Sequence, residues 1–109
     1  MSKIEANLKN IIFAIDKIKN YTSEFEDADG FYNNQKSFDA VLMQFIVIGE
    51  AVSRLDEAFK EETSYIPWKE IKSFRNIIAH DYFGVDANEV WEIINTKLIP
   101  LKNDIQKLL

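Results

Sequence analysis

The stretch SFDAVLMQFIVIGEAVSRLDEAFK, residues 37–60, decides the fold of this chain. Its apolar residues recur every three or four positions, which is the spacing of one face of an α-helix. The main face comprises Phe38, Val41, Leu42, Phe45, Ile48, Val52, Leu55 and Phe59. A face this broad must be covered by other apolar elements. We therefore expect one continuous helix over 37–60 in an all-helical domain.

Two further helices are indicated by apolar residues on either side of this stretch. The first runs from about Ser2 into the low twenties, and an acidic loop that contains Asp29 and Gly30 ends it. Its apolar stripe consists of Ile4, Leu8, Ile11, Ile15 and Ile18. Another helix begins at Pro67, because proline is well tolerated at a first helical position. The buried side of that helix consists of Trp68, Ile71, Phe74 and Ile78.

The start of the last helix is marked by Asp86 and Glu89, which have capping-box spacing, and by Val85 and Val90 at the positions of a hydrophobic staple. The apolar phase continues across Pro100, although proline removes a backbone donor and clashes with the preceding turn. We expect one kinked helix there or two nearly collinear ones. Four principal helices with short connections predict an antiparallel four-helix bundle, formed by residues 1–109 as a single domain.

Composition restricts the possible functions. The chain has 109 residues, a net charge of −5 and no cysteine, so disulfides and thiolate sites are excluded. Its start lacks the apolar segment of a signal peptide, and its longest apolar run, at 45–49, is far too short to cross a bilayer. These features predict a soluble cytoplasmic protein. The net acidity argues against a generic nucleic-acid binder.

A second apolar surface accompanies the main face of the 37–60 helix. Met43, Ile46 and Val47 lie away from the main stripe, on the flank that also carries Glu50. A helix that is apolar nearly all round is either fully buried or covered by another chain. Because full burial is hard to arrange in so small a bundle, we expect these three residues to form the interface of a homodimer. The alternative is a central helix wrapped by the other three.

The segment RNIIAHDY, residues 75–82, contains the only histidine of the protein. One imidazole cannot build a metal site from several histidines, so we expect no metal and no cofactor here. His80 and Asn76 lie one turn apart, away from the apolar side of their helix, where a core histidine is not expected. Arg75 lies on the flank of the same helix, too far round to touch His80 directly. Lysines in the preceding residues make this neighbourhood locally basic.

An arginine and a histidine provide the groups needed for phosphoryl transfer without a metal. An imidazole exchanges protons near neutral pH, and a guanidinium binds phosphate oxygens and stabilises the charge that develops on them. RNA carries its own nucleophile in the 2′-hydroxyl. Arg75 and His80 could therefore cleave RNA if a second proton-transfer group came from another residue, a water molecule or a second subunit.

This R-x4-H element, with Tyr82 two residues after the histidine, resembles the signature of the HEPN superfamily, in particular of HepT-like toxins. The resemblance also covers Ile48-Gly49-Glu50-Ala51, Ile66-Pro67-Trp68, Asp81-Tyr82-Phe83 and Val90-Trp91. It implies a homodimeric, metal-independent endoribonuclease with Arg75 and His80 as catalytic residues and Asn76 in support. The toxin of such a type II pair is neutralised by an MNT-type nucleotidyltransferase antitoxin, with which it can form a larger hetero-oligomer. Tyr82 would be the residue that accepts AMP.

Two neighbouring carboxylates have open roles. Glu50 either orients a catalytic side chain or pairs with Arg54 one helical turn away. Asp81 either raises the pKa of His80 or caps the end of the helix. Two other classes of function also remain open: a non-catalytic HEPN subunit that binds a nucleotide or the nucleotidyltransferase, and a purely structural helical adaptor.

Overall fold

The structure is a computed structural model that describes residues 2–109. Within these residues the chain forms helices and connecting turns and no strand, which confirms the all-α prediction. The elements in chain order are α1 (Lys3–Thr22), α2 (Ala28–Asn33), α3 (Gln35–Ser53), α4 (Glu57–Glu62), α5 (Trp68–His80), a 3-10 turn η1 (Tyr82–Gly84), α6 (Ala87–Thr96) and α7 (Leu98–Gln106).

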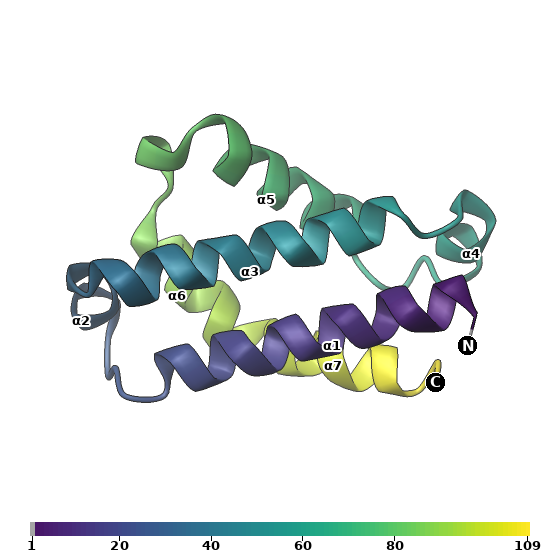
Figure 1. Ribbon diagram of the computed structural model, residues 1–109, viewed down its shortest axis with the longest axis horizontal. Helices are drawn as coiled ribbons and strands as arrows, with labels where there is room; N and C mark the ends of the chain where they lie inside the picture. Colours follow the sequence, from purple (N-terminus) through teal and green to yellow (C-terminus); the bar gives the residue numbers. More distant parts are fainter. Residues whose placement is uncertain (1) are drawn as a thin grey trace.

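Helix α3 is the central element of the arrangement (Figure 1). It packs against α1 on one side and against α5 on the other, while α7 lies beside α1 and α2 packs against α6. Both chain ends lie at one end of the long axis, and α2 and the α5–η1 turn lie at the opposite end (Figure 1). The fully buried side chains at the centre include Ile11, Ile15, Ile18, Val41, Ile48, Val52, Ile94 and Ile105.

The first helix agrees with its prediction, since Ser2 caps α1 by accepting a hydrogen bond from the Glu5 backbone N–H at 3.0 Å. The acidic stretch after α1 was expected to be a loop, yet it contains the short helix α2. Asp27 caps α2 by accepting from the Gly30 N–H at 2.8 Å. Burial of Phe31 stabilises this helix. Its ring is completely buried between α3 and α6 and packs at a tilted angle against Phe38 and Trp91.

The predicted helix over 37–60 is wrong after residue 53. Helix α3 ends at Ser53, and the separate short helix α4 begins at Glu57, after its N-cap residue Asp56. The break lets Leu55 remain buried while Phe59 turns back towards Trp68, with 6.4 Å between the ring centroids. The Lys60 ammonium group then donates to the Val52 carbonyl oxygen at 3.3 Å, and the same oxygen accepts the Leu55 backbone N–H at 3.1 Å at the end of α3.

The C-terminal region forms two helices and not one kinked helix, since α6 and α7 meet at Lys97. Pro100 lies in the first turn of α7, where its missing N–H costs no intrahelical hydrogen bond. Asp86 caps α6, but it accepts from the Asn88 N–H at 2.8 Å rather than from Glu89. The expected capping box is therefore replaced by a simple N-cap.

Helix α5 packs along α3 and leaves a groove of about 610 Å³ between itself and α6–α7. Phe45 and Ile48 line the groove from α3, and Ile71 and Phe74 line it from α5. Helix α5 is thus fixed mainly by its contact with α3. Among residues 2–109 there is no helix both long and apolar enough to pass through a lipid bilayer.

Candidate active site

The R-x4-H helix, α5, lies close against α3 at Gly49. A methyl group on Gly49 would overlap the Cβ and Cγ atoms of Arg75, so only glycine leaves room for this arginine. Glycine inside a helix costs about 1 kcal/mol relative to alanine. Here that cost allows the arginine side chain to lie directly against the backbone of α3.

Arg75 is held by two polar side chains of α3. Its Nη1 lies 3.4 Å from Oε1 of Glu50, and its Nη2 donates to the Ser53 hydroxyl at 3.3 Å. The Arg75 side chain is only 19% exposed, and its Nε is buried with no hydrogen-bond partner among residues 2–109. Glu50 thus pairs with Arg75 across two helices, and no Glu50–Arg54 ion pair occurs in the described part of the chain.

His80 is the last residue of α5 and is exposed. It follows Arg75 by five positions, which places the two side chains about 140° apart around an ideal helix. No hydrogen bond within residues 2–109 joins them, because Arg75 turns towards α3 and His80 faces outwards. Asn76, half-buried, precedes His80 by one turn. A single copy of the chain therefore does not bring the arginine and the histidine into one pocket.

Asp81 shapes the turn that follows His80. Its carboxylate accepts a hydrogen bond from the Gly84 N–H at 3.1 Å and so caps the 3-10 turn η1. A Cβ at Gly84 would collide with this carboxylate in its present position, so a larger residue there would displace the Asp81 cap. Asp81 therefore has a capping role, as one of its two predicted roles required. Its carboxylate, however, caps the turn after the helix and not the end of the helix itself.

Tyr82, the first residue of η1, contacts α3 through both its hydroxyl and its ring. Its hydroxyl donates a hydrogen bond to the carboxylate of Asp39, and its ring packs edge-on against Phe38 at 6.5 Å between centroids. The hydrogen bond to Asp39 raises the pKa of Tyr82 above its ordinary value of 10.0, because the carboxylate favours the protonated phenol; burial and Tyr32 add to the effect. Phe83, the next residue, is 95% exposed.

Sequence reasoning missed Asp39 and Ser53. On an ideal helix they share one flank of α3 with Glu50, but Met43 and Ile46 project from the same flank, so no polar stripe marks them in the sequence. This flank faces α5, where it contacts Tyr82 and Arg75.

Two of the three residues expected at a dimer interface are exposed to solvent, and the third is half-buried. Met43 is 54% exposed and Val47 is 37% exposed. Ile46, however, is half-buried and packs against the core of its own chain. Further exposed apolar side chains, Ile77 and Phe83, belong to α5 and η1. The exposed apolar surface of this region thus comes from both helices rather than from α3 alone.

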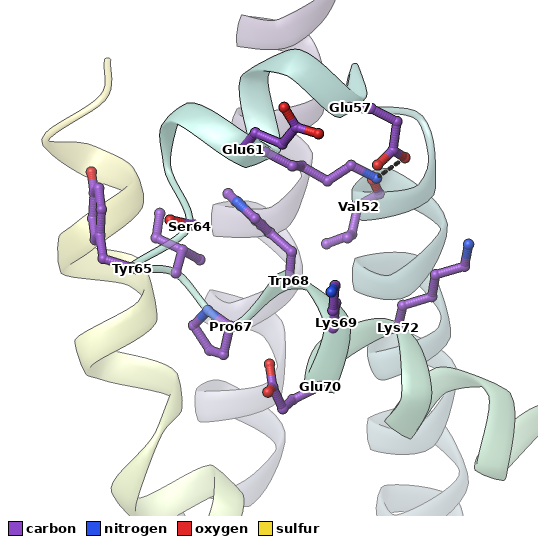
Figure 2. A pocket seen from close by; sticks show the side chains of 12 residues that line it. Val52, Glu57, Glu61, Ser64, Tyr65, Pro67, Trp68, Lys69, Glu70 and Lys72 are labelled. Carbon is purple, nitrogen blue, oxygen red and sulfur yellow. Dashed lines mark hydrogen bonds and ion pairs between the residues drawn. The ribbon is translucent and has the colours of Figure 1, made fainter.

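A second concavity, of about 670 Å³, lies at the other end of α5, where α4 meets the connection to α5 (Figure 2). Lys69 and Lys72 border it, as does Lys60, which pairs with Glu57 at 3.0 Å. The pKa of Glu57 is lowered, chiefly by its hydrogen bond and charge pairing with Lys60 and less by Lys72 and Lys69. The basic character predicted around Lys69 and Lys72 is therefore offset by acidic residues of α4.

Comparison with known proteins identifies the family of this chain. The model of the family described as "Ribonuclease HepT-like" matches residues 11–108. The protein named "Probable ribonuclease HepT" from Thermococcus cleftensis is 35% identical over 103 residues, which cover 93% of this chain and 91% of that protein. "Putative RNase MJ0125" from Methanocaldococcus jannaschii is 35% identical over 106 residues, which cover 97% of this chain and 90% of that protein.

A longer relative from the same archaeon is named "Gamma-glutamylcyclotransferase and putative RNase MJ0434". It is 34% identical over 106 residues, and the match covers 97% of this chain but only 47% of that protein. No solved structure matches the chain. The family match and the near-complete alignments show that this chain belongs to the HepT-like ribonucleases of the HEPN superfamily.

Proposed function

We propose that this chain is a metal-independent endoribonuclease in which Arg75 and His80 are the catalytic residues. The observation that carries the proposal is that Arg75 and His80, on the same helix, lie in different environments. Arg75 is fixed by Glu50 and Ser53, as a group that must be pre-positioned for a phosphate would be, while His80 is exposed at the helix end. Fixed donors stabilise developing charge without the cost of reorganisation.

The proposed reaction uses the 2′-hydroxyl of RNA as the nucleophile. The 2′-oxygen bonds to the adjacent phosphorus, the bond from phosphorus to the 5′-oxygen breaks, and a 2′,3′-cyclic phosphate forms. His80 either takes the proton of the 2′-hydroxyl or gives a proton to the leaving 5′-oxygen. Arg75 stabilises the charge on the phosphate oxygens. A second proton-transfer group completes the balance, and His80 of a second copy can supply it.

A homodimer follows from this chemistry. Because Arg75 and His80 of one copy diverge, a second copy that contributes the opposite wall would bring complete pairs together in a shared cleft. The exposed apolar side chains of Met43 and Val47 on α3, with Ile77 on α5, lie on the helices that such a cleft must use. Burial of these side chains would stabilise the dimer.

The reaction type is tested with purified protein and a short RNA. We expect cleavage to continue in excess EDTA, because Arg75 and His80 supply the charge stabilisation and the proton transfer. A matched oligonucleotide with one 2′-deoxy nucleotide at the cut position should resist cleavage there, since it lacks the nucleophile. Loss of activity with EDTA, or equal cleavage of the deoxy substrate, would contradict the mechanism. Products are read by mass, which separates a cyclic phosphate from a linear one.

The dimer surface is tested with Val47→Glu. A charge placed on the exposed apolar part of α3 should shift the protein from dimer to monomer in sedimentation velocity, because an unpaired buried carboxylate is costly. Ile99→Glu is the matched control, since Ile99 is an exposed apolar residue of similar exposure, 43% against 37%, on the distant helix α7. A dimer that persists in the Val47 variant would place the interface elsewhere.

We also propose that the chain is the toxin of a type II toxin–antitoxin pair and that an MNT-type nucleotidyltransferase neutralises it by adding AMP to Tyr82. The Tyr82 hydroxyl lies at the surface in the turn directly after His80. A nucleotide there would place a negative charge beside the catalytic end of α5 and repel the RNA backbone. The resulting complex would be a hetero-oligomer of the two proteins.

Co-expression with such a nucleotidyltransferase tests the modification. We expect the intact mass to rise by one or more adenylates in the wild type and to stay unchanged in Tyr82→Phe, which lacks the acceptor oxygen. Tyr65→Phe is the control, because Tyr65 is a more exposed tyrosine, 63% against 38%, in the connection before α5. An adenylate on the Tyr82 variant would move the acceptor to another residue.

One observation favours a second candidate, a non-catalytic subunit that binds a nucleotide or the nucleotidyltransferase. The charge of Arg75 is already paired with Glu50, so this arginine could serve as a structural link between α3 and α5. A wild-type protein that binds RNA or nucleotide without cutting, under conditions where it is dimeric, would support this candidate over the nuclease.

A further inference from the structure

We propose that Asp39 is the general base that takes the proton of Tyr82 when a nucleotide is transferred to it. This inference rests on the modification proposed above and names the residue of this chain that assists it. Asp39 lies in the N-terminal part of α3, and its Oδ1 accepts the hydrogen bond of the Tyr82 hydroxyl across 43 positions of sequence. The target protein would thus contribute a group to its own modification.

The contacts of Asp39 are more consistent with a general base than with a residue that serves only in packing. Its side chain is exposed, and Tyr82 is its one hydrogen-bond or ion-pair partner within residues 2–109. Tyr82 does not depend on Asp39 alone for its position. Its ring rests against Phe38, and the Asp81 cap fixes the turn that carries it. The contact with Asp39 therefore adds a proton acceptor to a side chain that other residues already hold.

The chemistry of transfer needs such an acceptor. The phenol oxygen of Tyr82 attacks the α-phosphorus of a nucleoside triphosphate held by the nucleotidyltransferase, and pyrophosphate leaves with the electrons of the broken phosphorus–oxygen bond. The proton of the phenol passes to the carboxylate of Asp39. A tyrosine phenol of ordinary pKa 10.0 is neutral at physiological pH, and the contact with Asp39 raises the pKa of Tyr82 further, so the proton must be removed during the reaction.

The pH dependence of transfer separates a base from a positioning residue. The titratable groups that face the Tyr82 hydroxyl are Asp39 on α3 and Tyr32 on α2. Asp39→Asn keeps an oxygen that can accept the phenol hydrogen bond but has almost no affinity for the proton. If Asp39 is the base, the variant should be slow at neutral pH and should approach the wild-type rate as the pH nears the pKa of Tyr82, because a phenolate needs no base.

The experiment uses the full chain with the nucleotidyltransferase and ATP, and it measures the rate of adenylate addition by intact mass over a range of pH. We expect Asp39→Asn to be slower at neutral pH by roughly 100-fold or more, with Asp39→Glu recovering part of the rate. Asp29→Asn is the control, because Asp29 is an exposed acidic residue of α2 whose side chain takes part in no hydrogen bond or ion pair within residues 2–109. It should behave as wild type.

Each outcome decides between the proposals. A wild-type rate for Asp39→Asn, with Tyr82→Phe unmodified, would overturn the role of Asp39 and leave Tyr82 as the acceptor. A deficit of equal size at every pH would also overturn it, because that result describes a positioning residue. A wild-type chain that receives no adenylate would remove the modification proposal and this inference with it, while leaving RNA cleavage by Arg75 and His80 untouched.

Discussion

Replacing His80 by alanine is expected to lower the rate of RNA cleavage by roughly 10²–10⁴-fold, the usual contribution of a general acid or base. The same change should leave the thermal midpoint nearly unaltered, because His80 is exposed at the end of α5 and its side chain makes no hydrogen bond within residues 2–109. The two measurements are cleavage of a labelled RNA and thermal unfolding by circular dichroism. Ser73→Ala, another exposed position on α5, is the matched control and should preserve both.

Arg75→Ala provides the contrast to this variant. It should also abolish cleavage, but it leaves Glu50 and Ser53 without their partner and removes packing against Gly49, so the free energy of unfolding should fall as well. Activity that survives in the His80 variant at more than about a tenth of the wild-type rate would remove the histidine from the reaction. The proposed catalytic pair of Arg75 and His80 would then be wrong, and another residue would have to transfer the proton.

Gly49→Val is expected to have the largest effect of any single change on the junction of α3 and α5. The added carbons would occupy the space of the Arg75 Cβ and Cγ atoms, so α5 must move away from α3. Forced overpacking typically costs about 1–3 kcal/mol, which should appear as a lower denaturant midpoint. Because Arg75 is displaced from Glu50 and Ser53, RNA cleavage should fall in parallel.

The control for this change is Gly30→Val in the short helix α2. A Cβ at Gly30 would lie 3.3 Å from an Asp27 carboxylate oxygen and 3.9 Å from Phe25, so the steric conflict is milder and distant from α5. Cleavage should be preserved in that variant. If Gly49→Val proved as stable and as active as wild type, the close approach of the two helices would not be what holds the arginine in place.

Local sequence signals were sufficient for some parts of the fold and not for others. The apolar stripe defined α1 correctly, because its periodicity continues over the whole length of the helix. The break after Ser53 was not visible, since Leu55 and Phe59 keep the helical phase of α3 in sequence. Only the tertiary contacts of Phe59 with Trp68 and of Lys60 with Val52 distinguish two helices from one.

The candidate site shows the same limit. The sequence placed Arg75, His80 and Tyr82 on one element because they are close in the chain. It left open whether Glu50 pairs with Arg54 or with a more distant group, and it gave no reason to single out Asp39. Both answers depend on how α5 lies against α3, which is set by a glycine rather than by any charged residue. Pairings across 25 and 43 positions are therefore seen only in the folded chain.

The placement of the chain ends has a practical consequence. Both lie at the end of the long axis opposite the α5–η1 turn (Figure 1), so a polypeptide joined to either end projects away from His80 and Tyr82. An affinity tag or a fluorescent fusion should therefore leave substrate access and recognition by a modifying enzyme undisturbed. The same geometry would let this domain form one half of a longer polypeptide without change to the end that carries the α5–η1 turn.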